Sequence, residues 1–284
     1  MEKLYLSIEE FNKLKEIGHG TDGCVYKYSK DTLIKVYHKN LIKFSNNEEI
    51  LTKRDKIYKG EKIPFKGSEA NFNYYLNDDN GVIKIRSKDA LVKAAEKQKY
   101  ITRTKLPKGA IYINNKCVGA VLDRINGIQI HKLSSMPLKY RYQIIKSLLL
   151  DVDELLKNNI YHIDLSNSPY STKCYTRDKD GNVIAIKGHS HVLVNPITKK
   201  TNIIDLDGKS TIYTEKYSEK FEKACIDNIC TLLIEFLYNV DTDDITDDEI
   251  YYELLNKSID DTLASNLAYE NFHNIDEIKK VLKI

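Results

Sequence analysis

The spacing of hydrophobic residues changes along the chain, and this change divides it into two parts. In the first part, short segments alternate apolar and polar residues, which is typical of β-strands. These segments are residues 11–18, 24–30, 32–39, 110–115 and 116–125. One helix is expected among them, over residues 89–100, where Leu91, Ala94 and Ala95 form an apolar stripe.

After Gly127 the pattern becomes helical. Residues 137–159 place seven apolar side chains on one stripe at helical spacing and predict a long amphipathic helix. Short strands are expected at 191–195 and 201–207, and helical periodicity returns from residue 219. A strand-rich part followed by a helix-rich part predicts an α+β fold of two lobes.

The predicted lobes divide the chain between residues 126 and 127. The first lobe, residues 1–126, is expected to be mainly β, and the second, residues 127–284, mainly α. Residues 40–88 lack a sustained period, so we interpret them as an insertion in the first lobe. A length of 284 residues is sufficient for both lobes to bury a core.

Composition and charge exclude several classes of protein. With 42% hydrophobic and 30% charged residues, the chain has a globular composition. The net charge of +3 is small and the lysines are dispersed, so we expect no nucleic-acid partner. No apolar run reaches 18 residues and the first residues lack the layout of a signal peptide, so no membrane association is expected. The five cysteines form no C-x-x-C pair, which favours a reduced, cytoplasmic protein without structural zinc.

The stretch GHGTDG, residues 18–23, spaces three glycines as GxGxxG and is the first candidate for chemistry. A dinucleotide-binding fold would need a helix directly after the glycines, but alternating, strand-like residues follow them. A Walker A loop would need lysine and then serine or threonine where Cys24 and Val25 stand. The remaining interpretations are a structural hairpin, or a glycine-rich loop over phosphates with Lys35 on the next strand within reach of them.

The second half of the chain supplies two further motifs. His162-x-Asp164 directly follows the long predicted helix, and Asp205 lies in the stretch IIDLDG after a predicted strand. Together with the glycine loop and Lys35, this order resembles the protein-kinase-like superfamily over roughly residues 11–240. The resemblance implies a two-lobed protein-kinase-like fold and a phosphotransferase that depends on ATP and Mg²⁺.

By this resemblance, Lys35 would bind the α- and β-phosphates, Asp164 would orient the attacking hydroxyl, and Asp205 would bind magnesium. His162 would be a buried histidine that holds the loop. The remaining nucleotide contacts would come from the glycine loop, from apolar residues beside the adenine ring, and from backbone groups at the end of a strand. These residues are Ile17, Gly18, Gly20, Gly23, Val25, Leu122, Asp123 and Ile125.

The resemblance also requires a carboxylate partner for Lys35 on a helix packed behind the strands. Glu96, on the helix expected at 89–100, fits this role best. Glu49 is the alternative, if residues 45–58 form that helix instead.

Two further aspartates have two interpretations each. Asp207 would be a second metal ligand or a turn former beside Gly208. Asp227 would cap the catalytic loop from a central helix, or it would be an acidic residue near the N-terminus of that helix.

The chain departs from the family pattern after Asp164. The superfamily places a metal-binding asparagine five residues beyond this aspartate, where the chain has Pro169. We interpret residues 168–190 as an inserted hairpin, so that His191 takes the place of the asparagine as a metal ligand. Asn167 is the alternative source of that ligand. Imidazole is a poorer ligand for magnesium than an amide oxygen, which weakens a second magnesium position.

The acceptor of the phosphoryl group is less constrained. Little chain separates Gly208 from Asp227, so a full activation segment does not fit between them. We expect transfer of the γ-phosphoryl group to a protein serine or threonine hydroxyl. The alternatives are a small-molecule hydroxyl, as in the aminoglycoside and choline kinase relatives, and a catalytically inactive pseudokinase.

Overall fold

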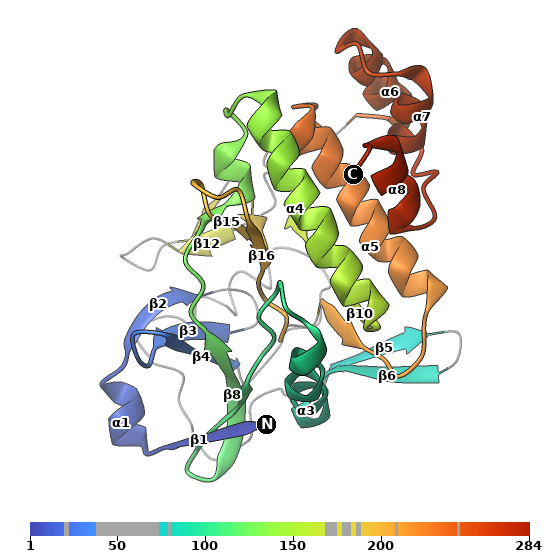
Figure 1. Ribbon diagram of the computed structural model, residues 1–284. Coiled ribbons are helices and arrows are strands. Elements are labelled where there is room, and N and C mark those ends of the chain that lie inside the picture. The colour runs from blue at the N-terminus through green and yellow to red at the C-terminus, as the bar shows by residue number, and fades with distance from the viewer. Residues whose placement is uncertain are drawn as a thin grey trace.

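The structure, a computed structural model, describes residues 1–19, 23–37, 74–78, 81–167, 175–177, 183–185, 189–207, 210–242 and 245–284. Strands dominate the N-terminal half of the described residues and helices dominate the C-terminal half, so the expected α+β class is confirmed. Figure 1 shows these as a strand-rich part, blue to green, and a helix-rich part, green to red. No helix in the described ranges combines the length and apolarity that a membrane span needs.

The N-terminal half is built on a six-stranded mixed sheet of order β1-β7-β8-β4-β3-β2. β1 runs parallel to β7, and the other neighbouring strands are antiparallel. The strands are β1 (Glu2–Leu6), β2 (Lys15–His19), β3 (Gly23–Lys27), β4 (Thr32–Tyr37), β7 (Gly109–Ile113) and β8 (Lys116–Asp123). Helix α1 (Ile8–Asn12) joins β1 to β2 and begins with a capping box of Ser7 and Glu10.

The helices of the C-terminal half share one large core. Leu148 and Leu149 of α4 are buried in it together with Ile226 and Ile229 of α5, as the apolar stripe of residues 137–159 predicts. The helices of this half are α4 (Leu138–Lys157), α5 (Glu219–Leu232), α6 (Asp247–Asn256), α7 (Asp261–Ala268) and α8 (Ile275–Val281), with single turns η2 (Ile130–Leu133) and η3 (Leu233–Leu237). From the N-terminal half, α3 (Lys88–Lys97), followed by the single turn η1 (Gln98–Tyr100), adds Ala90 and Ala94 to the same core.

Short strand pairs lie around the helical core and hold the loops of interest. β10 pairs with β17, β11 with β14, β12 with β13, β5 with β6, and β15 lies between β16 and β9. Their bounds are β5 (Tyr74–Asp78), β6 (Gly81–Arg86), β9 (Ile128–Gln129), β10 (Ile160–His162), β11 (Ser166–Asn167), β12 (Tyr175–Arg177), β13 (Val183–Ala185), β14 (His189–Ser190), β15 (Val192–Val194), β16 (Thr201–Ile203) and β17 (Thr211–Tyr213).

Both expected insertions are described in part. Of residues 40–88, the structure describes the antiparallel pair β5–β6 and the start of α3, and 40–73 and 79–80 lie outside the described residues. Of residues 168–190, it describes the antiparallel pair β12–β13 and the strand β14.

Strand β4 alternates its side chains between the two faces of the large sheet. Ile34 and Val36 are fully buried in a core on one face. Lys35 and Tyr37 therefore point to the other face, where Tyr37 packs in a second core with Leu91 of α3. The alternation directs Lys35 away from the core that contains Ile34 and Val36 and toward the face that carries Tyr37.

A buried carboxylate joins α4 to its neighbours. Asp151 accepts hydrogen bonds from Arg103 Nε at 2.7 Å and from the Thr201 hydroxyl. Burial raises its pKa from 3.8 to about 6, although the hydrogen bond from Thr201 and the charge of Arg103 act in the opposite direction. Arg103 follows α3 and Thr201 begins β16, so this contact links the strand-rich half to the helical core.

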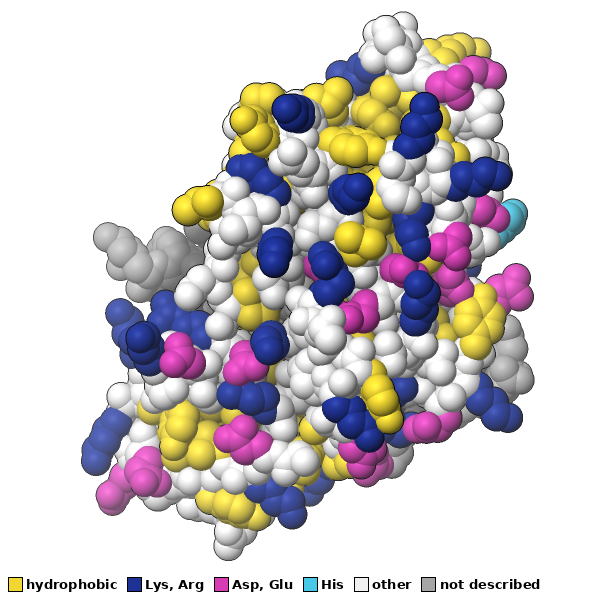
Figure 2. All heavy atoms as spheres, viewed as in Figure 1, with side chains coloured by type: hydrophobic (Ala, Val, Ile, Leu, Met, Phe, Trp, Pro, Cys, Tyr) yellow, Lys and Arg dark blue, Asp and Glu magenta, His cyan; other side chains and the backbone are white. Residues whose placement is uncertain are grey.

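The face of the molecule drawn in Figure 2 carries charges of both signs. Lys and Arg side chains lie singly on it, with Asp and Glu side chains between them. The coloured residues of this face therefore form no continuous surface of one sign, in keeping with the net charge of +3.

Candidate functional site

The centre of the candidate site is Lys35, which forms ion pairs with two aspartates 170 and 172 residues further along the chain. Its Nζ atom pairs with Asp205 Oδ1 and lies 3.5 Å from Asp207 Oδ2. The side chain of Asp207 is fully buried, and the Tyr37 hydroxyl donates to its Oδ2 at 2.8 Å. Since Lys35 and Tyr37 are two residues apart on β4, one face of the strand presents both to the IIDLDG segment.

The large sheet places the glycine motif in line with Lys35. The strand register aligns Gly18 with Val25, Val25 with Lys35, and Lys35 with Ala120. Partner residues on neighbouring strands share a face, so Val25 lies on the same side of the sheet as Lys35. A Cβ atom at Gly18 would meet nothing within 4 Å, which leaves the backbone at the start of the motif open to approach.

Asp205 has an unusual backbone conformation. Its φ of 63° lies in the left-handed region, which costs a non-glycine residue about 1–2 kcal/mol. The Thr211 hydroxyl donates to the Asp205 carbonyl oxygen at 3.1 Å and holds this turn. Burial alone would raise the pKa of Asp205, but the charges of Lys35 and His191 lower it well below its usual value. Asp205 is therefore a carboxylate under all ordinary conditions.

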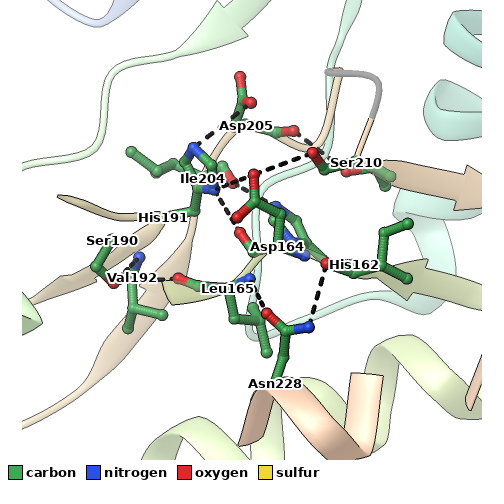
Figure 3. A network of polar contacts seen from close by, with 12 residues as sticks. His162, Asp164, Leu165, Ser190, His191, Val192, Ile204, Asp205, Ser210 and Asn228 are labelled. Carbon is green, nitrogen blue, oxygen red and sulfur yellow. Dashed lines mark hydrogen bonds and ion pairs between the residues drawn. The ribbon is translucent and has the colours of Figure 1, made fainter. Parts of the chain in front are cut away.

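Asp164 follows strand β10 and lies next to Asp205 in space (Figure 3). Ser210 Oγ donates to Asp164 Oδ2 at 3.2 Å. The Asp164 side chain is 36% exposed, compared with 20% for Asp205 and 8% for Lys35. It is therefore the carboxylate of this group that an incoming molecule reaches most easily.

His162 is a buried structural histidine, as the sequence predicts. The backbone N–H of Asp164 donates to its Nδ1 at 3.3 Å, so Nε2 carries the proton and donates to the Ile204 carbonyl oxygen at 3.2 Å. Burial, and then the nearby His191, lower the pKa of His162 to about 3. The neutral ring ties the Asp164 loop to the segment that carries Asp205.

His191 bridges Asp164 and Asp205. Its Nδ1 lies 2.5 Å from the Asp164 carbonyl oxygen, and its Nε2 lies 3.7 Å from Asp205 Oδ2. A carbonyl oxygen only accepts hydrogen bonds, so Nδ1 is the donor and Nε2 is the atom turned toward Asp205. Figure 3 shows the ring between the two carboxylates.

The Asp164 loop is fixed from α5 by Asn228. Its Oδ1 accepts from the Leu165 backbone N–H at 3.2 Å, and its Nδ2 donates to the Ile163 carbonyl oxygen at 3.2 Å. One of the two interpretations of Asp227 gave it this role, and that interpretation is wrong: Asp227 instead pairs with Lys223 one turn earlier on α5. A shift of one residue turns a helical position by about 100°, so only Asn228 faces the loop.

The prediction that Glu96 pairs with Lys35 is also wrong. The buried residues of α3 are Ala90, Leu91 and Ala94, and Glu96 lies on the opposite side of the helix, exposed. No ion pair joins it to Lys35, whose charged partners within the described ranges are Asp205 and Asp207. The alternative partner, Glu49, lies outside the described residues.

The other predicted nucleotide contacts lie on β2, β3 and β8 of the large sheet or shortly after β8. Ile17 is 49% exposed, whereas Val25, Leu122 and Ile125 are half-buried. Asp123 forms an ion pair with Lys108 at 2.7 Å, which occupies its side chain.

A Cβ atom at Gly23 would lie 2.3 Å from the Val36 carbonyl oxygen, so this glycine is needed for strand packing. Gly20 lies outside the described residues, and so does the side chain of Asn167.

Sequence reasoning missed Tyr37, Ser210 and Asn228 as members of the site. Tyr37 had a signal, because a residue two positions after Lys35 on a strand must share its face. No pattern in the sequence indicated Ser210 or Asn228, since their contacts depend on how β17 and α5 pack.

A comparison with protein-family models finds no match for this chain. A comparison with the curated proteins finds none either.

Proposed function

We propose that this protein is a phosphotransferase of the protein-kinase-like type, with a two-lobed fold, that uses ATP and a divalent cation. The observation that supports this most is the meeting of Lys35 with Asp205, beside Asp164. These residues come from a strand of the large sheet, the turn after β16 and the loop after β10. A cation, a metal-binding carboxylate and an accessible carboxylate in one place are what phosphoryl transfer requires.

Asp205 and His191 supply some of the ligands that a divalent cation needs. Asp205 supplies a carboxylate, and His191 Nε2 faces its Oδ2 across 3.7 Å. A bound cation would neutralise charge on the phosphate oxygens. Within the described ranges, no group of three or more His, Cys, Asp or Glu residues forms a complete metal site. The remaining ligands would therefore come from the nucleotide and from water.

The chain's own residues have separate roles in this proposal. Lys35 binds phosphate oxygens, and Asp207, held by Tyr37, keeps the ammonium in place. Ser210 fixes one oxygen of Asp164, and the exposed carboxylate accepts a hydrogen bond from the acceptor hydroxyl and orients it. The backbone amides near Gly18 approach the phosphates from the sheet.

The acceptor we propose first is a serine or threonine hydroxyl of a protein. A small-molecule hydroxyl is the second candidate, and one observation favours it. β17 begins at Thr211 and pairs at once with β10, and α5 begins at Glu219. The chain between Asp207 and α5 is therefore short, and much of it is committed to this strand pair, which limits a platform for an extended peptide.

The proposal is tested by nucleotide binding and then by turnover. ATP should raise the melting temperature of the wild type in a cation-dependent manner, and Asp205→Asn should abolish that shift, while Asp276→Asn, an exposed position on α8, should retain it. Transfer from γ-labelled ATP to a protein or small-molecule acceptor should be lost in Asp164→Asn. Binding without transfer to any acceptor would make the protein a pseudokinase, and absence of any nucleotide effect would refute the proposal.

A further inference from the structure

The position of His191 bears on which cation the site takes. The superfamily pattern would place an asparagine here, with an amide oxygen for the metal and an amide N–H beside it. His191 reproduces that layout with a ring: Nδ1 donates to the Asp164 carbonyl oxygen at 2.5 Å, and Nε2 is turned toward Asp205 Oδ2. Its side chain is only 10% exposed, so the ring is held in this orientation.

The hydrogen bond at Nδ1 prepares the ring to be a ligand. Histidines that bind metals usually donate their other N–H to a carbonyl or a carboxylate, which fixes the tautomer and the plane of the ring. With a proton on Nδ1, Nε2 is the ring nitrogen that faces Asp205, and it is the atom whose lone pair a metal ion would take.

The distance between His191 and Asp205 also fits a bridging ion. A separation of 3.7 Å is too long for a hydrogen bond, which needs about 2.7–3.2 Å. A metal ion about 2.1 Å from each atom would span such a gap. The two carboxylate oxygens of Asp205 face different partners: Oδ1 pairs with Lys35, and Oδ2 faces the His191 ring.

We infer that this site selects a transition-metal ion, Mn²⁺ in preference to Mg²⁺. This inference rests on the proposed function. Magnesium prefers oxygen ligands throughout and gives up its waters reluctantly, so an imidazole nitrogen is a poor exchange for it. Manganese shares the octahedral geometry and the affinity for carboxylate and phosphate oxygens, and it accepts imidazole more readily. One nitrogen among oxygens therefore shifts the preference from magnesium to manganese.

The first test measures metal binding without turnover. Mn²⁺ is titrated into the protein with a non-hydrolysable ATP analogue, and free Mn²⁺ is followed by its electron paramagnetic resonance signal, with Mg²⁺ as competitor. The wild-type complex should prefer Mn²⁺ over Mg²⁺ at least tenfold more strongly than the analogue alone does. His191→Asn should reduce this excess to threefold or less, and His273→Asn, at an exposed position near α8, should leave it unchanged.

A second measurement on the wild type does not depend on a variant that folds. The Mn²⁺ complex should show magnetic coupling to an imidazole ¹⁴N nucleus by electron spin-echo spectroscopy. Absence of this coupling, or equal metal preference in the wild type and His191→Asn, would overturn the inference while cation-dependent nucleotide binding upheld the proposed function. If no cation supports nucleotide binding, the proposed function itself fails.

Discussion

Asn228 gives the sharpest test of how the Asp164 loop is held. Replacing it with alanine removes the acceptor of the Leu165 N–H and the donor to the Ile163 carbonyl oxygen. The matched control is Asp227→Ala, one position earlier on the same helix, where the side chain pairs only with Lys223 among the contacts described. One interpretation of the sequence gives the loop-capping role to Asp227, whereas the structure gives it to Asn228.

The expected magnitude follows from the contacts. Leu165 is fully buried, so leaving its N–H without an acceptor should lower the free energy of unfolding by about 1–3 kcal/mol. The higher helix propensity of alanine should raise it by about 0.5 kcal/mol. The free energy of unfolding of Asn228→Ala should therefore fall by roughly 0.5–2.5 kcal/mol. Asp227→Ala loses an i,i+4 pair whose side chains are about one-third exposed, which is worth about 0.3–0.5 kcal/mol, and the same gain in helix propensity offsets this loss, so its stability should change little.

Urea unfolding, with both variants measured beside the wild type, provides the assay. If the proposed function holds, Asn228→Ala should also lower kcat by roughly tenfold to a hundredfold through misplacement of Asp164, with the KM for ATP little changed. Equal losses of stability in the two variants, or a larger loss in Asp227→Ala, would refute the assignment of Asn228 as the residue that holds the loop.

Three further predictions concern other charged positions. Lys35→Met should reduce the free energy of unfolding by about 3–5 kcal/mol, because the buried carboxylates of Asp205 and Asp207 lose their counter-ion. Lys108→Met should cost about 1 kcal/mol or less in the same denaturant titration. Glu96→Gln should leave the dissociation constant for nucleotide unchanged in a thermal-shift titration, and a tenfold increase would restore Glu96 as the partner of Lys35. The raised pKa of Asp151, about 6 in the folded state against 3.8, stabilises the protein at low pH and loses that contribution as pH rises through 6. Between pH 7.5 and 5 the wild type should therefore gain about 1.4 kcal/mol relative to Asp151→Asn, measured as urea midpoints at each pH, and parallel pH profiles would contradict this.

The fold class and the site residues on strands could be predicted from the sequence. The face on which a strand residue lies depends on the alternation of side chains and not on where the strand begins or ends. Lys35 lies between Ile34 and Val36, and apolar neighbours on both sides send its side chain to the opposite face whatever the ends of the strand are. Because side chains alternate along a strand, Tyr37, two residues after Lys35, lies on the same face. The antiparallel register with β3 then brings Val25 and Gly18 into the same row. Errors of one or two residues in strand bounds leave these conclusions intact.

Residues on helices were not predictable in the same way, since each step along a helix turns the side chain by about 100°. Glu96 lies two residues beyond the buried Ala94 and so faces away from the core, although its helix was found correctly. Asp227 and Asn228 differ by a single step, and one points to Lys223 while the other holds the Asp164 loop. The acidic partners of Lys35 within the described residues lie in a turn. Asp205 adopts a left-handed backbone and Asp207 is buried two residues later, a geometry that depends on β17 packing against β10 and that no periodicity encodes. Motif spacing therefore located the charged groups, while tertiary packing decided which carboxylates meet the lysine.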